Sequence, residues 1–316
     1  MASSLTCLLI LCFAAPAAVP DSPGHARAWA VLSVLSIWLS SVALASAKPL
    51  GASNKQNAAL CRLRILGGDN GTLQHASMNC TGTTKPTVVL NAAHLGSFQR
   101  NFRGVVLAAS CESKMTEDNP CLIAVCSGTI VMRYSRVARV RDIPIKGLVC
   151  VVRNSRLEVH SSRFIDNQIR PIMVGDHAHM ILRASNVWNN EVGDYADGGG
   201  LWVEGDAHVT ITGGSRVQNN VVDEDGGGLA VWDNASVTIT GGSMVQGNMA
   251  GGDGGGMTVG GNASVVVAGG STISNNTADG SVDERLTYGD MQASPSLVVV
   301  GCRATVPPEG AEEVCL

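Results

Sequence analysis

Residues 226–248 read GGGLAVWDNASVTITGGSMVQGN, and closely similar stretches begin at Gly198 and at Gly254. The three copies follow one another at a spacing of 28 residues. A fixed period of roughly 20–50 residues is typical of solenoids, propellers and repeat arrays. The sequence therefore describes one structural unit that is repeated, and its residues indicate what kind of unit it is.

Within each copy, large apolar residues alternate with small or polar ones, as in Leu229-Ala230-Val231. This period of two is typical of a strand with one buried face, and Thr, Val and Ile favour strands. Gly-Gly pairs and Asn or Asp separate the runs, as turns require. We predict three short strands per unit in an all-β, right-handed single-stranded parallel β-helix, with coils about 4.8 Å apart. A propeller ranks second, because its blades need about 40 residues.

The repeats also predict which side chains point inward, because the same apolar type recurs at the same place in each unit. The predicted inward columns are Leu201, Leu229 and Met257; Val203, Val231 and Val259; Val209, Val237 and Val265; Ile211, Ile239 and Val267; and Val217, Val245 and Ile273. The positions between the first two columns are predicted to face outward, namely Trp202, Ala230 and Thr258.

Each unit ends in the pattern Ser-x-apolar-x-x-Asn, which extends the solenoid upstream. Its asparagines are expected to form a ladder that satisfies backbone groups at one corner, namely Asn167, Asn190, Asn220, Asn248 and Asn276. We predict a solenoid over residues 126–281. Residues 48–125 are expected to form an irregular, cysteine-containing cap with imperfect coils, and residues 282–316 a C-terminal cap with a strand-like run at 297–300.

The pairing of Gly-Gly-Gly-Leu with apolar-x-x-Asn resembles the GGA(I/L/V) and FxxN repeats of polymorphic outer membrane proteins. Phe164-Ile-Asp-Asn167 is the literal FxxN form. More broadly, the sequence is similar to secreted right-handed β-helix proteins of the pectin-lyase-like superfamily. The resemblance covers residues 160–280 and implies the fold. The first family also implies a role in adhesion at a cell surface.

The N-terminal residues predict export. An apolar stretch at 28–47 follows Arg27 and ends in Ala45-Ser46-Ala47, the small-x-small pattern that precedes signal cleavage. We predict that residues 1–47 are a signal peptide and that the mature protein is secreted or lies at the cell surface. The stretch is also long enough to span a bilayer, so an uncleaved signal anchor is the alternative and would be the membrane contact.

Cysteines and glycosylation sequons agree with export. An even number of cysteines follows Ala47, and none lies in the regular repeats, which predicts disulfides in the irregular end regions. Cys302–Cys315 is the preferred C-terminal pair, and the other pairings stay open. The sequons predict N-glycosylation at Asn70, Asn79, Asn234, Asn262 and Asn275.

Charge divides the chain into a basic and an acidic part. Residues 48–188 contain 18 Lys or Arg and 8 Asp or Glu, whereas residues 189–281 contain 11 acids and only Arg216 as a base. The basic side chains either solvate one outer face or bind an anionic polymer, and the two oppositely charged parts could also associate head to tail between copies. We expect no nucleic-acid partner.

Two sets of residues are candidates for ligand binding. Asp197, Asp225 and Asp253 precede the glycine triplets and are expected to stack, where their charges repel. A Ca²⁺ ion would relieve this repulsion, and the alternative is a set of solvated Asp-Gly turns. Trp202 and Trp232 are expected to stack on sugar rings if they face outward. The fold itself requires no cofactor.

These observations predict a non-catalytic, secreted or cell-surface β-helix scaffold. Such a structural or adhesive module is expected to bind extracellular polysaccharide, or matrix and surface proteins. The alternative is a carbohydrate-active β-helix enzyme, either a polysaccharide lyase or a glycoside hydrolase. That chemistry needs carboxylates on neighbouring strands of one outer face. The best repeats are rich in Thr there, so no catalytic residue is assigned, and an enzymatic site would lie in the Arg-rich coils near Glu158, Asp166 and Asp176.

Overall fold

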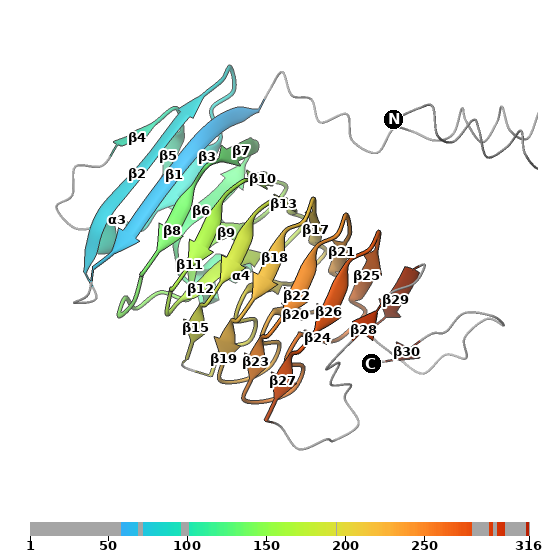
Figure 1. The fold of residues 1–316 in the computed structure, drawn as a ribbon. Helices are drawn as coiled ribbons and strands as arrows, with labels where there is room; N and C mark the ends of the chain where they lie inside the picture. The colour runs from blue at the N-terminus through green and yellow to red at the C-terminus, as the bar shows by residue number, and fades with distance from the viewer. Residues whose placement is uncertain are drawn as a thin grey trace, which may run out of the picture. The chain divides into compact units, whose positions relative to one another are not determined.

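The computed structural model describes residues 58–68, 72–95, 101–193, 195–279, 291–292, 296–300 and 314–315. These residues belong to one compact unit, Lys55–Leu316. They form a parallel β-solenoid with very little helix, in which each coil lies directly on the one before it (Figure 1). The predicted all-β parallel β-helix is therefore confirmed.

Each coil contributes strands to the same sheets in the same order. Sheet B has eight strands, and all its pairs are parallel from the third strand onward. Its members, in spatial order, are β5 (Val106–Ala108), β3 (Thr87–Leu90), β6 (Cys121–Ser127), β9 (Gly147–Val151), β12 (Arg170–Val174), β16 (Leu201–Val203), β20 (Leu229–Val231) and β24 (Met257–Val259).

Sheet A receives two strands from each coil, separated by a bend. The first strands are β7 (Thr129–Arg133), β10 (Arg156–His160), β13 (His179–Arg183), β17 (His208–Thr212), β21 (Ser236–Ile239) and β25 (Ser264–Ala268). The second strands are β8 (Arg136–Ala138), β11 (Arg163–Ile165), β14 (Asn186–Trp188), β18 (Arg216–Gln218), β22 (Met244–Gln246) and β26 (Thr272–Ser274).

The regular coils contain four strands, so the prediction of three per unit is wrong. The additional strand has two residues and follows the buried asparagine of each coil. It belongs to a four-stranded sheet C, formed by β15 (Glu191–Val192), β19 (Val221–Val222), β23 (Met249–Ala250) and β27 (Thr277–Ala278). Two residues are too few to show an alternating pattern, which is why the sequence did not reveal this strand.

Strands outside the regular coils cover both ends of sheet A, and several of them pair antiparallel. At the N-terminal end, β1 (Ala59–Gly67) lies parallel to β7 and β8 and antiparallel to β2 (Leu73–Thr81), which pairs with β4 (Asn101–Arg103). At the C-terminal end, β28 (Met291–Gln292) and β29 (Ser296–Val300) pair antiparallel with β26 and β25. A last strand, β30 (Val314–Cys315), pairs with β29. Capped ends are what a stacked repeat needs to protect its edges.

The core confirms the predicted inward columns, whose side chains are all buried. Two buried polar ladders run beside them at the corners. In the asparagine ladder, Oδ1 of Asn220 accepts from the backbone N–H and from Nδ2 of Asn190, at 3.2 and 2.8 Å. In the serine ladder, the N–H of Ser162 donates to Ser185 Oγ at 3.0 Å. Buried backbone groups at the corners are thereby satisfied by the neighbouring coil.

A short segment, the strap (residues 109–120), lies on the outer face of sheet B. It contains the helix α4 (Lys114–Asp118), and another helix, α3 (Ala92–Leu95), follows β3. The disulfide Cys111–Cys126 joins the strap to β6. A second, Cys121–Cys150, joins β6 to β9, and a third, Cys61–Cys80, joins β1 to β2. Met115 of the strap packs in one cluster with Cys150 and Met173 of the sheet.

Candidate functional site

Basic side chains gather on the outer face of sheet A, over its N-terminal coils. Parallel register aligns β1 with β8, β7 with β10 and β13, and β8 with β11. Side chains that point outward therefore form columns along the stack. We call the following set the cationic face: Arg64, Arg133, Arg136, Arg156, His160, Arg163 and Arg183.

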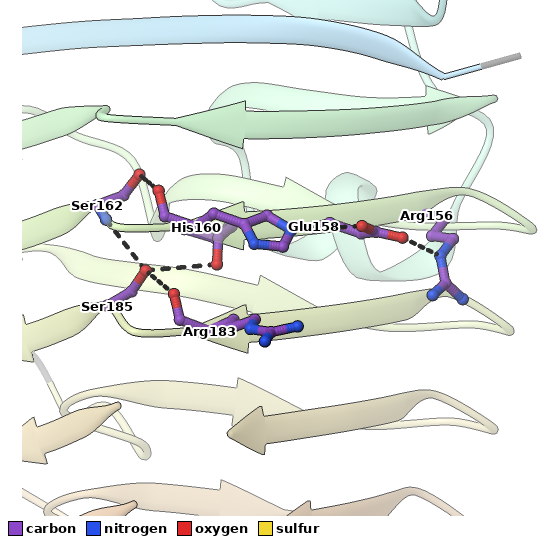
Figure 2. Close-up of polar contacts among 7 residues, drawn as sticks. Arg156, Glu158, His160, Ser162, Arg183 and Ser185 are labelled. Carbon is purple, nitrogen blue, oxygen red and sulfur yellow. Dashed lines mark hydrogen bonds and ion pairs between the residues drawn. The ribbon is translucent and has the colours of Figure 1, made fainter. Parts of the chain in front are cut away.

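Glu158 is the one carboxylate at an outward strand position within the cationic face, and it is buried to 7% exposure. Figure 2 shows how its two neighbours on β10 hold it: Arg156 Nε lies 3.0 Å from Oε1, and His160 Nε2 lies 3.3 Å from Oε2. Residues two apart on a strand share one face, so this trio follows from the alternation of β10. Both carboxylate oxygens are thus engaged.

The environment of Glu158 fixes its charge. Burial alone would raise the pKa of this carboxyl group, but hydrogen bonds from Arg156 and His160 outweigh burial and hold the pKa below its ordinary value of 4.5. Glu158 is therefore an anion at neutral pH. It orients its two partners and is a poor proton donor.

The bend in sheet A positions His160 and Arg183 through the serine ladder. Ser162 Oγ donates to the carbonyl oxygen of His160 at 2.8 Å, and Ser185 Oγ donates to that of Arg183 at 2.8 Å (Figure 2). Ser161 and Ala184 make the bend with φ values of 48°. These contacts fix the backbone from which the two basic side chains project.

The remaining arginines of the cationic face have no acidic partner in the part of the chain that the structure describes. There, ion pairs join only Arg156 and His160 to Glu158, and His177 to Asp206. The guanidinium groups of Arg133, Arg163 and Arg183 are exposed. The cationic face thus carries an uncompensated positive charge on a rigid sheet.

Beyond β13, the outer face of sheet A changes character. The columns that contain Glu158 and Arg183 continue as Thr210 and Thr212 in β17, followed by Thr238 in β21. Between the two regions, the rings of His179 and His208 stack with their centroids 5.0 Å apart. Burial, His208 and Arg156 lower the pKa of His179. Among the described residues, no group of three His, Cys, Asp or Glu is placed to hold a metal ion.

Trp202 does not lie at an open surface, because it packs against the cluster that contains Met115 of the strap and Met173 of β12. Trp202 is half-buried, and the guanidinium carbon of Arg170 lies 4.4 Å from the centroid of its ring. Arg170 is itself buried and donates from Nε to the carbonyl oxygen of Asp197 at 2.6 Å. Burial lowers the pKa of Arg170 to about 10, so it stays charged at neutral pH. One face of the Trp202 ring is therefore covered by the guanidinium group of Arg170.

Trp232 and Ala230 also differ from a simple outward row. Trp232 is half-buried, and its ring lies against Gly260 of the next coil, where a Cβ atom would overlap it. Ala230 was predicted to face outward, but it is fully buried between the larger side chains of Trp202 and Thr258 in neighbouring strands. Ala230 thus lies in the outward row predicted for it, but this row is not open to solvent at a small side chain between two larger ones.

The three aspartates do stack, through hydrogen bonds to the backbone. Oδ1 of Asp197 accepts from the N–H of Asp225 at 3.2 Å, and Oδ1 of Asp225 accepts from the N–H of Asp253 at 2.7 Å. Burial raises the pKa of Asp197, with a further contribution from the charge of Asp225. Each of these bonds gives the first two carboxylates a structural role in the turns. Calcium binding at this ladder stays a prediction.

The sequons lie in different environments. Asn79 is exposed on β2, and Asn275 is exposed at a corner with a φ of 53°. Asn234 and Asn262 are exposed and bonded in a row, with Asn262 Nδ2 donating to Asn234 Oδ1 at 3.1 Å. Asn70 lies outside the described residues, as does Cys302 of the predicted C-terminal disulfide.

A hollow of about 500 Å³ lies beside the start of sheet C. Arg170 and Lys146 line it together with three acids, Asp142, Glu191 and Asp223. Because charges of both signs alternate around it, its walls favour no one class of ligand.

Sequence reasoning missed two features of this region. Trp188 is 43% exposed on β14, although the pattern Ser-Asn-Val-Trp-Asn-Asn already places Val187 inward and hence Trp188 outward. The pairing of Glu158 with His160 was also missed. Its signal is the spacing Arg-x-Glu-x-His on a strand, which puts all three side chains on one face.

No helix of the described residues is long and apolar enough to cross a bilayer. The three disulfides between residues 61 and 150 are typical of an oxidising, extracellular-type compartment. Comparisons with family models, with curated proteins and with solved structures found no match to this chain. The site must therefore be interpreted from its own geometry, as a rigid, positively charged sheet surface.

Proposed function

We propose that the protein is a secreted or cell-surface β-helix scaffold whose cationic face binds an acidic extracellular polysaccharide without altering it. The observation that carries this proposal is the set of exposed arginines with no acidic partner among the described residues, on neighbouring strands of one sheet. A structural or adhesive role in a matrix or wall follows from such binding.

The electrostatics of the cationic face support an anionic polymer as the ligand. Neighbouring parallel strands are about 4.8 Å apart, so stacked guanidinium groups repel by roughly 1 kcal/mol per pair even in water. A polymer with regularly spaced carboxylates or sulfates would replace this repulsion by attraction. Guanidinium groups bind such oxyanions through two parallel hydrogen bonds. This binding is expected to weaken as salt is added.

The scaffold also supports binding because it is pre-organised. Arg163 directly follows Ser162 of the serine ladder, and Ser185 Oγ donates to the carbonyl oxygen of Arg183. Few backbone degrees of freedom are therefore lost when a ligand binds. The likeness of the Gly-Gly-Gly-Leu and FxxN repeats to polymorphic outer membrane proteins supports a surface role. The predicted signal peptide and the disulfides agree with export.

A carbohydrate-active enzyme is the second candidate, and the pairing of Glu158 with His160 favours it. A carboxylate that hydrogen-bonds one nitrogen of a histidine orients the ring, which is how many general bases are held. The side chain of His160 is 22% exposed. In the register of sheet A, His160 lies between Arg133 on β7 and Arg183 on β13. In this reading His160 abstracts a proton from a sugar whose acidic group the arginines bind.

The experiment uses the full chain and two polymers that share a backbone, dextran and dextran sulfate, together with alginate as a carboxylate polymer. We expect binding to dextran sulfate and alginate, none to dextran, and weaker binding in high salt. Combined replacement of Arg133, Arg163 and Arg183 by Ala is expected to weaken binding at least tenfold, about 1.4 kcal/mol in total. The matched control replaces three exposed lysines off sheet A, Lys85, Lys114 and Lys146, and is expected to bind like the wild type.

The outcomes separate the candidates. Equal binding of dextran and dextran sulfate, or unchanged affinity in the triple arginine variant, would overturn the proposal. Release of shortened or unsaturated products from alginate, lost in His160→Ala, would establish the enzyme instead. Each titration is repeated with calcium and with a chelator. A calcium effect on the melting temperature that disappears in Asp225→Asn would confirm the predicted calcium ladder, and identical curves would contradict it.

A further inference from the structure

The second strands of sheet A present two outward columns side by side. Register pairs Arg64 with Arg136, Arg136 with Arg163, Arg163 with Asn186 and Asn186 with Arg216. The adjacent column is mainly apolar and consists of Leu66, Ala138, Ile165 and Trp188, followed by Gln218. A basic column therefore runs directly beside an apolar one that contains a large aromatic ring.

The ring of Trp188 is available, unlike that of Trp202. Its side chain is 43% exposed, and the described residues hold a single cation–π pair, which is Arg170 over Trp202. On its own strand the neighbour on the same face is Asn186, which is half-buried and uncharged. Trp188 thus extends the apolar column to the surface without a protein group stacked on its ring.

Arg163 and Arg216 lie on the strands on either side of Trp188. They pair with Asn186, two residues before Trp188, so each is a diagonal neighbour of the indole. Parallel strands lie about 4.8 Å apart and rise about 3.3 Å per residue, so positions offset by two residues are about 8 Å apart, within reach of long side chains. One aromatic platform is therefore flanked by two exposed guanidinium groups, neither of which has an acidic partner in the described region.

We propose that Trp188 is a stacking platform for a pyranose ring, while Arg163 and Arg216 bind the acidic substituents of the same polymer. This inference rests on the proposed function and makes its ligand more specific. The partner is a chain of acidic sugar rings that lies along the stack of coils, and polyanions without rings bind more weakly. The apolar face of a sugar suits the indole ring, whereas the carboxylate or sulfate suits the guanidinium groups.

Single-stranded nucleic acid also combines rings with negative charge, but the strip fits it less well. Proteins that bind it stack successive bases on several aromatic side chains. Here the neighbours of Trp188 in its column are Ile165 and Gln218, so one ring stands alone. An extracellular-type disulfide pattern also favours a polysaccharide.

The test measures the affinity of the full chain and of Trp188→Ala for alginate, inorganic polyphosphate and an oligothymidylate. We expect Trp188→Ala to bind alginate about three- to tenfold more weakly, the loss of one aromatic contact, and to bind polyphosphate like the wild type. Trp188→Phe is expected to retain most of the affinity. Gln218→Ala, the next residue in the same column, is the matched control and is expected to change nothing.

Each result decides a separate question. If the wild type binds alginate and polyphosphate but Trp188→Ala binds alginate normally, the stacking inference fails and the proposed function stands. An equal loss for alginate and polyphosphate would also overturn the inference, because the ring would then act through the fold. Tightest binding of the oligothymidylate, lost in Trp188→Ala, would replace the polysaccharide by nucleic acid. If the wild type binds none of the three, both proposals fail.

Discussion

The coils from β6 to β14 and those from β16 to β27 share one interior but have different exteriors. Both regions bury an asparagine at the same corner and a serine at the same bend, with 0–7% exposure throughout. Outside, the first region carries arginines and the trio around Glu158, whereas the second carries threonines. The comparison shows that stacking requires the buried asparagines and serines, whereas the outward residues can differ from coil to coil.

The interior is constrained because the buried asparagines and serines bond to groups of the neighbouring coils. Asn190, Asn220, Asn248 and Asn276 each accept from the asparagine before them, although the coils differ in length. The outward positions make no such bonds between Thr210 and Thr238 or between Arg133 and His160. Their residues can therefore change without loss of the fold, which is where a binding face can arise.

The largest loss of stability is expected from a substitution in the asparagine ladder, which both regions share. In Asn220→Ala, the N–H and Nδ2 of Asn190 lose their acceptor, and the carbonyl oxygen of Val187 loses its donor at 3.2 Å. Buried polar groups without partners cost roughly 1–3 kcal/mol each, so we expect a loss of about 3 kcal/mol or more. Urea unfolding followed by circular dichroism measures it, with the outward Gln246→Ala as the control. Equal stabilities of the two variants would contradict the role of the ladder.

A smaller loss of stability is expected at the glycines of the regular coils, where some are crowded by neighbouring atoms and others have a positive φ. A Cβ at Gly228 would overlap the carbonyl oxygen of Gly256 and lie 2.8 Å from a methyl carbon of Val245. At Gly242 no atom lies within 4 Å, but φ is +70°. We expect Gly228→Ala to lose about 2–3 kcal/mol by overpacking, and Gly242→Ala to lose about 1 kcal/mol by backbone strain. Thermal melts compare the two, and a reversed order would show that the coils are not in close contact at the glycine triplet.

The smallest effect concerns the charged exterior of the first region. Because the pKa of Glu158 is lower in the folded protein than its ordinary value of 4.5, the ionised group stabilises the fold above that pH. This contribution is lost as the pH falls through the lowered pKa. We therefore expect Glu158→Gln to cost roughly 1–2 kcal/mol at pH 7, and this cost to shrink as the pH falls below 4.5.

The matched control is Glu117→Gln on the strap, which is exposed and has no ion pair among the described residues. Stability curves from pH 3 to pH 7 measure both variants. A loss for Glu158→Gln that stays constant over this range would indicate a packing defect rather than a lost charge.

Period and alternation were sufficient to predict the stacked coils and their inward columns, because both patterns come from contacts that repeat. Val217, Val245 and Ile273 lie where the spacing of 28 residues puts them. The four-strand coil was missed, since pairs such as Val221–Val222 are too short to show a period. Disulfide connectivity was not readable from the sequence either, because it depends on which strands and segments become neighbours in the irregular N-terminal part.

The candidate site was harder to predict than the fold. Trp202 was expected to face outward, but the strap and Arg170 cover it, and no repeat pattern encodes a contact with a segment far away in sequence. Trp188 does follow from the pattern, but it lies in a coil with fewer matching residues than the glycine-rich ones. The trio of Arg156, Glu158 and His160 depends only on alternation within one strand, so it could have been predicted from the sequence of β10.

The disulfide Cys121–Cys150 joins β6 to β9, two consecutive coils of the stack. No other disulfide in the described region lies C-terminal to it. If the protein anchors a matrix, it will be pulled, and parallel coils under tension peel from an end one after another. The covalent bond between the first two coils would stop peeling from the N-terminal side. The threonine-bearing coils would then separate first, and the coils that carry the cationic face would stay folded while the far end extends.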